Sequence, residues 1–236
     1  MKKLESRKLI KKKESDEMQR KIIFGICFIF MFVMIGSLVA KEQTVDPVIV
    51  TEHFYKENAK LKYPQVDRLS SQKVKEKLNK GFQTYIEKSA KEWADIQKDA
   101  EEHNYTADYQ TDFEVRYNQA PFLSIVTSNY KYTGGAHGNT IVESFNYHIE
   151  NGKRIYLTDI LVDEEQIKSV QNFVWEYAIE RPEIFYPDLK KEDVLLTKDT
   201  AFYFNDTGIT LLFQQYEIAP YASGNQEIVV PEALYD

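Results

Sequence analysis

The chain has 236 residues, of which 43% are hydrophobic and 28% charged, and its net charge is −7 at pH 7. Such an acidic balance speaks against nucleic acid as a partner, because both would carry negative charge. The single cysteine, Cys27, excludes an intramolecular disulfide, so a folded domain must be stabilised by its packed core.

Residues 22–40 are nineteen uncharged and mostly apolar positions, about the length that a helix needs to cross the hydrocarbon core of a bilayer. The leader, residues 1–21, holds nine lysine or arginine residues against four acids, which predicts a cytoplasmic N-terminus. We expect a single-pass protein of the cell membrane with an extracellular domain at residues 41–236. A cleaved secretory signal is the alternative, but cleavage after Ala40 would put Leu38 at the −3 position, which needs a small residue.

Charge divides at this predicted membrane segment. The leader carries +5, which leaves −12 for residues 41–236. An acidic exterior would steer a cationic partner toward itself and repel anionic polymers. A second interpretation is that the acidic surface only aids solubility. An exported domain without a disulfide suits a Gram-positive cell surface.

The first half of the exterior contains a strand pair and a long helix. Branched and aromatic residues predict a strand at residues 48–55, paired with the stretch that ends at Pro64. From Ser70 the apolar residues recur at three- and four-residue steps, which predicts an amphipathic helix to about Glu102 with Gly81 as a weak point. We interpret its aromatic stripe as the face that packs on a sheet rather than as a ligand platform.

Further strands and a second helix follow. Strand-like runs end in turn signals, of which Asn151-Gly152 is typical of a short hairpin. A second helix should begin after its cap Asp163 and end before Pro182. The expected strands lie at residues 109–118, 122–132, 140–148, 154–157, 201–205, 209–214 and 227–230. This order predicts an α+β fold of mainly antiparallel sheets packed with two main helices, preceded by the transmembrane helix.

Two loops stand out from this regular pattern. Residues 132–138 hold three glycines within five positions, which permits unusual backbone angles and a close approach to the main chain. Residues 216–224 combine two tyrosines with a proline, which offers contact area at small entropic cost. The candidate ligand-binding residues are Gly134, Gly135, Ala136, His137, Gly138, Tyr216, Glu217, Ile218, Ala219, Pro220 and Tyr221.

The sequence offers no arrangement for catalysis. It contains no G-x-S-x-G, H-E-x-x-H or P-loop pattern, and none of its four histidines has a second histidine at metal-ligand spacing. We interpret His137 as a structural histidine satisfied by a neighbouring carbonyl. Two carboxylates distant in sequence can still meet in space, so glycoside hydrolysis stays open. We expect no enzymatic activity, no metal and no cofactor.

The two loops resemble those of the anti-sigma-V factor (RsiV) family, and the resemblance extends over roughly residues 48–236. The same kind of domain precedes the catalytic domain of some peptidoglycan deacetylases of the PdaC type. Other motifs that carry the resemblance are Tyr63-Pro64, Leu123-Ser124-Ile125, Leu157-Thr158-Asp159 and Phe202-Tyr203-Phe204 with Gly208.

The resemblance implies a domain that binds lysozyme directly, with contacts from Pro220, Tyr221 and residues 134–138. It also implies that binding exposes the anchor to proteolysis, which frees a sigma factor. We therefore expect a membrane-anchored sensor or binding protein whose ligand is lysozyme or another cell-wall-associated molecule. Two alternatives stay open: an anti-sigma factor that holds an ECF sigma factor through its leader, and a cell-wall hydrolase or accessory domain of peptidoglycan modification.

Overall fold

The computed structural model describes residues 47–236, which belong to one compact unit, Asp46–Asp236. The predicted leader and the predicted membrane segment, residues 22–40, lie outside the described residues. Within the described range, no helix combines the length and the apolar character that crossing a bilayer requires.

A two-stranded hairpin and one long helix open the described chain. Strand β1 (Ile49–Phe54) pairs antiparallel with β2 (Lys62–Arg68), with the short turn η1 (Tyr55–Glu57) between them. Glu52 lies opposite Pro64, so the predicted pairing is confirmed. Helix α2 (Gln72–His103) follows, and the side chain of Ser71 caps it by accepting from the amide of Val74.

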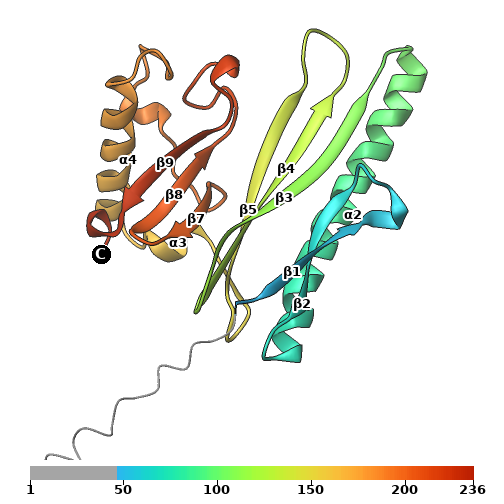
Figure 1. The fold of residues 1–236 in the computed structure, drawn as a ribbon. Helices are drawn as coiled ribbons and strands as arrows, with labels where there is room; N and C mark the ends of the chain where they lie inside the picture. The colour runs from blue at the N-terminus through green and yellow to red at the C-terminus, as the bar shows by residue number, and fades with distance from the viewer. Residues whose placement is uncertain (1–46) are drawn as a thin grey trace, which may run out of the picture. The chain divides into compact units, whose positions relative to one another are not determined.

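Helix α2 lies along one face of a four-stranded antiparallel sheet (Figure 1). The sheet has the order β3-β4-β5-β6, from β3 (Asp108–Gln119), β4 (Phe122–Tyr132), β5 (Asn139–His148) and β6 (Lys153–Ile155). Alternate side chains of β4, such as Leu123 and Ile125, join the core beneath the helix. Phe82 of α2 packs there against Phe145, with ring centroids 5.4 Å apart. The interpretation of the aromatic stripe as a packing face is confirmed.

Gly81 does not interrupt α2, contrary to the expected weak point. The hydroxyl of Tyr147 occupies the space that a Cβ at this position would need. Glycine therefore lets the helix approach the sheet closely, and the packing outweighs its low helix propensity.

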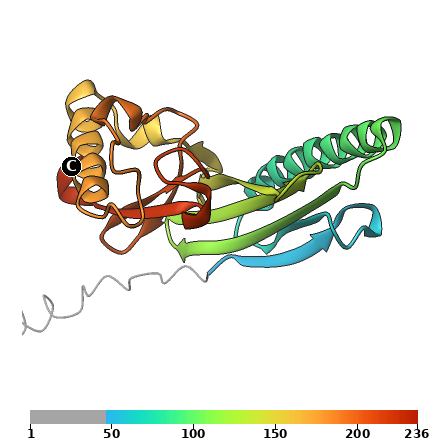
Figure 2. The same ribbon diagram turned by 90° about the horizontal axis from the view of Figure 1, so that it is seen from above.

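A second core forms between α4 and a three-stranded antiparallel sheet (Figure 2). Asp163 caps α4 (Glu164–Ile179) by accepting from the amides of Glu165 and Gln166, both at 2.9 Å. A short helix, α3 (Leu157–Ile160), stands where the last residue of a strand was expected. The remaining elements are η2 (Lys191–Asp193), β7 (Ala201–Asn205), β8 (Gly208–Phe213), η3 (Tyr221–Ser223), β9 (Gln226–Pro231) and η4 (Glu232–Leu234).

Side chains of the four-stranded sheet form hydrogen bonds with unpaired backbone groups of β7, an outer strand of the three-stranded sheet. The amide of Phe202 donates to Ser144 Oγ at 3.0 Å, and the amide of Phe204 donates to Ser124 Oγ at 3.1 Å. Asn146 Nδ2 donates to the carbonyl of Phe202 at 2.8 Å. Because Ser124 and Asn146 are fully buried, these bonds join the two sheets away from water.

The prediction of an α+β fold with antiparallel sheets is confirmed for the described residues. The described chain has three sheets, and it has the small helix α3 besides the two main helices.

Candidate functional site

The two predicted loops lie side by side, although His137 is 79 positions before Tyr216 and 84 before Tyr221. The rings of His137 and Tyr221 stack, with centroids 3.8 Å apart and planes inclined by 19°. The ring of Tyr216 lies 5.7 Å from that of Tyr221, and its hydroxyl lies 3.4 Å from His137 Nε2. We call His137, Tyr216 and Tyr221 the aromatic tip.

Glycines shape the first loop of the aromatic tip. Gly134 and Gly135 have φ angles of +87° and +93°, which side chains rarely allow. A Cβ at Gly138 would fall on the ring of Tyr130, so this position has no room for a side chain. The hydroxyl of Tyr132 donates to the carbonyl of Gly135 at 3.0 Å, which closes the loop on its own strand.

Two glutamines tie the second loop to the first. Gln214 Oε1 accepts from the amide of Val142 at 3.0 Å, and its Nε2 donates to the carbonyl of Val142 at 2.8 Å. Gln215 Oε1 accepts from the amide of Thr140 at 2.7 Å. We call Gln214 and Gln215 the glutamine clamp. It fixes the distance between the loops, and sequence analysis missed it, although two glutamines directly after a buried strand were a possible signal.

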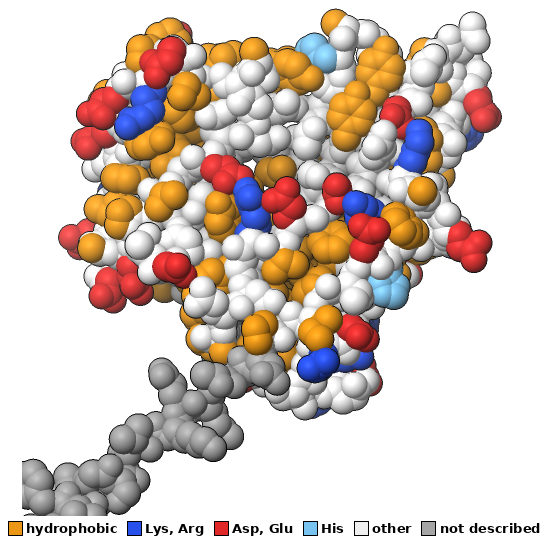
Figure 3. All heavy atoms as spheres, in the orientation of Figure 1, with side chains coloured by type: hydrophobic (Ala, Val, Ile, Leu, Met, Phe, Trp, Pro, Cys, Tyr) orange, Lys and Arg blue, Asp and Glu red, His pale blue; other side chains and the backbone are white. Residues whose placement is uncertain are grey.

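The predicted residues divide into exposed and buried groups. His137 and Pro220 are exposed, and the side chain of Tyr216 is 52% exposed. Gly138, Ile218 and Ala219 are buried, so they support the loops and are not available for direct contact. Apolar and histidine side chains lie beside each other at the upper edge of the molecule (Figure 3).

Both ring nitrogens of His137 have a polar neighbour. Its Nδ1 lies 3.0 Å from the carbonyl of Gly138, which can only accept, so Nδ1 carries the proton. Nε2 faces the hydroxyl of Tyr216. Within residues 47–236, no group of three or more histidine, cysteine or acidic side chains is placed to hold a metal ion.

Glu217 supports the second loop from within. Its Oε2 accepts from the amide of Gln214 at 2.6 Å. Burial raises the pKa of this carboxyl above its usual value, and the backbone hydrogen bond only partly opposes that shift.

We predict that Glu217 makes folding more favourable at acidic pH. Because its pKa is higher in the folded chain than in the unfolded chain, protonation favours the folded state. This contribution is complete below the usual carboxyl pKa and is lost as pH rises through the raised value. The free energy of unfolding of the wild type, relative to Glu217→Gln, should therefore increase when pH falls from 7 to 4 in denaturant titrations. A difference that stays constant with pH would contradict the prediction.

Two family models match successive parts of the chain. The model "Deacetylase PdaC" matches residues 52–140, and the model "Protein of unknown function (DUF3298)" matches residues 158–233. The first match includes the glycine loop, and the second includes the tyrosine loop. The aromatic tip therefore forms where the two matched regions meet.

A curated relative agrees with the first of these matches. The chain is 24% identical over 169 residues to peptidoglycan-N-acetylmuramic acid deacetylase PdaC of Bacillus subtilis (strain 168), with 67% of this chain covered. The match spans 35% of that enzyme's length. Together with the family models, it supports a PdaC-related DUF3298 domain.

Solved structures show the same fold. A DUF3298 family protein from Pseudomonas aeruginosa PAO1 has a TM-score of 0.57 at 18% identity, with 81% of this chain and 94% of that chain covered. A DUF3298 family member from Bacteroides fragilis NCTC 9343 has a TM-score of 0.55 at 19% identity, with 81% and 92% covered. At these identities the likeness describes the fold alone.

Proposed function

We propose that the described domain is a non-catalytic, cell-wall-associated binding module of the accessory kind found beside peptidoglycan-modifying enzymes. The aromatic tip is its contact surface. The relation to a peptidoglycan deacetylase supports the cell wall as the place of action.

The observation that carries this proposal is the stack that exposed His137 and Tyr216 form with half-buried Tyr221. Its members come from two loops that the glutamine clamp holds together, so the surface is formed before any ligand arrives. Rigid aromatic side chains lose little entropy on binding and can bury much apolar area. A fixed, exposed aromatic surface of this kind suits binding better than turnover.

We predict that the purified full chain co-sediments with insoluble peptidoglycan sacculi, and that Tyr216→Ala/Tyr221→Ala reduces its apparent affinity at least about tenfold. Two aromatic anchors near the centre of a contact surface commonly account for this much binding free energy. The measurement is the bound fraction across a titration of sacculi, at fixed salt and with non-ionic detergent present.

Phe54→Ala is the matched control, since Phe54 is an aromatic residue that is 42% exposed on β1. It should leave retention unchanged. Retention that is equal in the wild type and in the double variant would reject the aromatic tip as the contact surface. Absence of retention in every variant would reject peptidoglycan as the ligand.

Charge favours a second candidate, a cationic protein ligand, of which lysozyme is the first to try. Residues 41–236 carry −12, which is the complementary sign. This is the sensing role that the resemblance to the RsiV family implies. Calorimetry of the full chain with lysozyme should give a complex whose affinity falls as salt increases. Absence of heat at tens of micromolar would remove this candidate.

The anchor and the leader remain proposals as well. If residues 22–40 cross the membrane, the full chain should fractionate with membranes and its exterior should be open to added protease. If the leader binds a sigma factor, deletion of residues 1–21 should change transcription that depends on that factor.

A further inference from the structure

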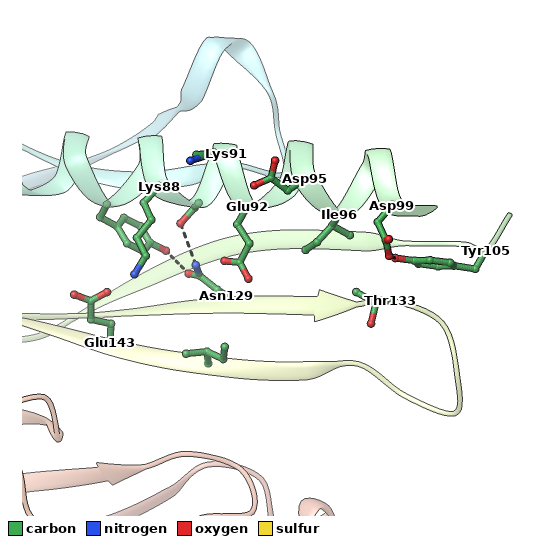
Figure 4. A pocket seen from close by; sticks show the side chains of 13 residues that line it. Lys88, Lys91, Glu92, Asp95, Ile96, Asp99, Tyr105, Asn129, Thr133 and Glu143 are labelled. Carbon is green, nitrogen blue, oxygen red and sulfur yellow. Dashed lines mark hydrogen bonds between the residues drawn. The ribbon is translucent and has the colours of Figure 1, made fainter. Parts of the chain in front are cut away.

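A long groove runs between α2 and the four-stranded sheet, apart from the aromatic tip. Its volume is about 860 Å³, within the range of ligand sites. One wall is the second half of α2, with Glu92, Asp95 and Asp99, and the other is formed by β4 and β5, with Ile141 and Glu143 (Figure 4).

Hydrogen bonds hold the floor of the groove rigid. Asn129 of β4 accepts from the hydroxyl of Tyr85, and its Nδ2 donates to Ser89 Oγ at 3.0 Å and to the hydroxyl of Tyr109 at 2.8 Å. The hydroxyl of Tyr109 in turn lies 3.1 Å from Glu92 Oε2. Burial raises the pKa of Tyr109 to about 12, so this hydroxyl stays a donor at any physiological pH.

Most carboxylates of the groove already have partners of their own. Lys131 Nζ lies 3.1 Å from Glu92 Oε1, and Arg154 Nη2 lies 3.0 Å from Glu143 Oε1. The hydroxyl of Tyr105 donates to Asp99. Glu92 and Glu143 are thus paired with cations and Asp99 with a neutral hydroxyl, and because Lys88 and Lys91 also line the groove, its charge is largely balanced. Such a site suits a neutral ligand with many hydroxyl and amide groups better than a strongly cationic one.

Apolar side chains interrupt the polar lining at intervals. Ile96 of α2, Ile141 of β5 and the ring of Tyr105 lie among the acids and amides. Ile141 is 43% exposed, which leaves apolar surface open to the groove. Sugar rings have the matching chemistry, because each has hydroxyl groups at its rim and an apolar face of C–H groups.

A second hollow adjoins the groove. This hollow of about 400 Å³ shares Lys88 and Glu143 with the groove and extends toward Arg154 and Lys198. In Figure 4, Lys88 and Glu143 point toward each other from opposite walls of the groove. The two adjoining hollows offer more room than one sugar ring needs, which suits several linked units.

We infer that the groove between α2 and the four-stranded sheet binds a neutral segment of a carbohydrate chain. The inference rests on the proposed function, since it names the class of cell-wall component that the module would hold. It assigns this binding to residues that the aromatic tip does not use.

The test is calorimetric titration of the full chain with chitotetraose, a neutral chain of four β-1,4-linked N-acetylglucosamine units. The wild type should bind, and Asp95→Ala/Ile141→Ala should bind at least about tenfold more weakly. Both residues are exposed on opposite walls, so their replacement leaves the core intact. Glu165→Ala/Val229→Ala, which removes an exposed acid and an exposed apolar side chain elsewhere, is the matched control and should bind as the wild type does.

Three outcomes would overturn the inference: no heat with millimolar chitotetraose, equal affinity in the groove variant, or binding of pentalysine in the groove in place of the sugar. Tyr216→Ala/Tyr221→Ala separates the two proposals. This variant should bind chitotetraose with the affinity of the wild type, even if its affinity for peptidoglycan sacculi falls. If the wild type does not bind chitotetraose but still binds sacculi through the aromatic tip, the inference is rejected and the proposed function stands.

Discussion

Replacement of Phe82 by alanine is expected to lower the free energy of unfolding by about 3–5 kcal/mol. Phe82 is fully buried between α2 and the sheet, and its ring contacts Phe145 and Tyr147 at centroid distances of 5.4 and 5.8 Å. Truncation removes both aromatic contacts and leaves a cavity that neighbouring Leu78 and Ile86 cannot fill without moving the helix. Chemical denaturation followed by circular dichroism measures the change.

Leu195→Ala provides the comparison, because Leu195 is a large apolar side chain that is 61% exposed. It should change the free energy of unfolding by less than about 0.5 kcal/mol. Similar losses in Phe82→Ala and Leu195→Ala would contradict the placement of the core beneath α2.

The double replacement Ser124→Ala/Ser144→Ala is expected to destabilise the fold by about 2–6 kcal/mol, since each of the two buried amides left without an acceptor costs about 1–3 kcal/mol. The amides concerned are those of Phe202 and Phe204 at the edge of β7. Their loss should loosen the three-stranded sheet from the four-stranded one. Amide hydrogen exchange in the variant, compared with the wild type, should therefore be accelerated more in β7 than in α2.

Ser70→Ala is the control for this pair, because Ser70 is exposed at the start of α2. It should leave both stability and exchange unchanged. Uniform acceleration of exchange across the chain would show that the serines support global stability rather than the junction of the sheets.

Local signals in the sequence were sufficient for most elements. The three- and four-residue spacing of apolar side chains defined α2, and Asp163 with Pro182 bounded α4 closely. The antiparallel hairpins followed from their turn residues. Gly81 was misjudged because helix propensity is a local property, whereas its neighbour Tyr147 comes from β5, 66 positions later in the chain.

The candidate site was predictable in its parts and not in its assembly. Glycine and tyrosine content identified both loops, but their meeting depends on the side chains of two residues directly after β8, which reach across to β5. The groove left a weaker trace: the apolar stripe of α2 turns polar at Ser89, Glu92 and Asp99, at the same helical spacing. That change could not be interpreted from the sequence, because it depends on Asn129 of β4, which hydrogen-bonds to Ser89 of the helix.

The glutamine clamp affects whether neighbouring copies of the protein can pair through their strands. An unprotected outer strand offers a row of amide and carbonyl groups on which strands of neighbouring molecules can assemble. Side-chain amides of the glutamine clamp occupy part of this row at residues 139–145 of β5, which β6 does not cover, and serine and asparagine side chains do so along β7. A foreign strand could pair at these places only after those hydrogen bonds break. Many copies held close together should thus resist pairing through these two strands, while each keeps its loops free for other contacts.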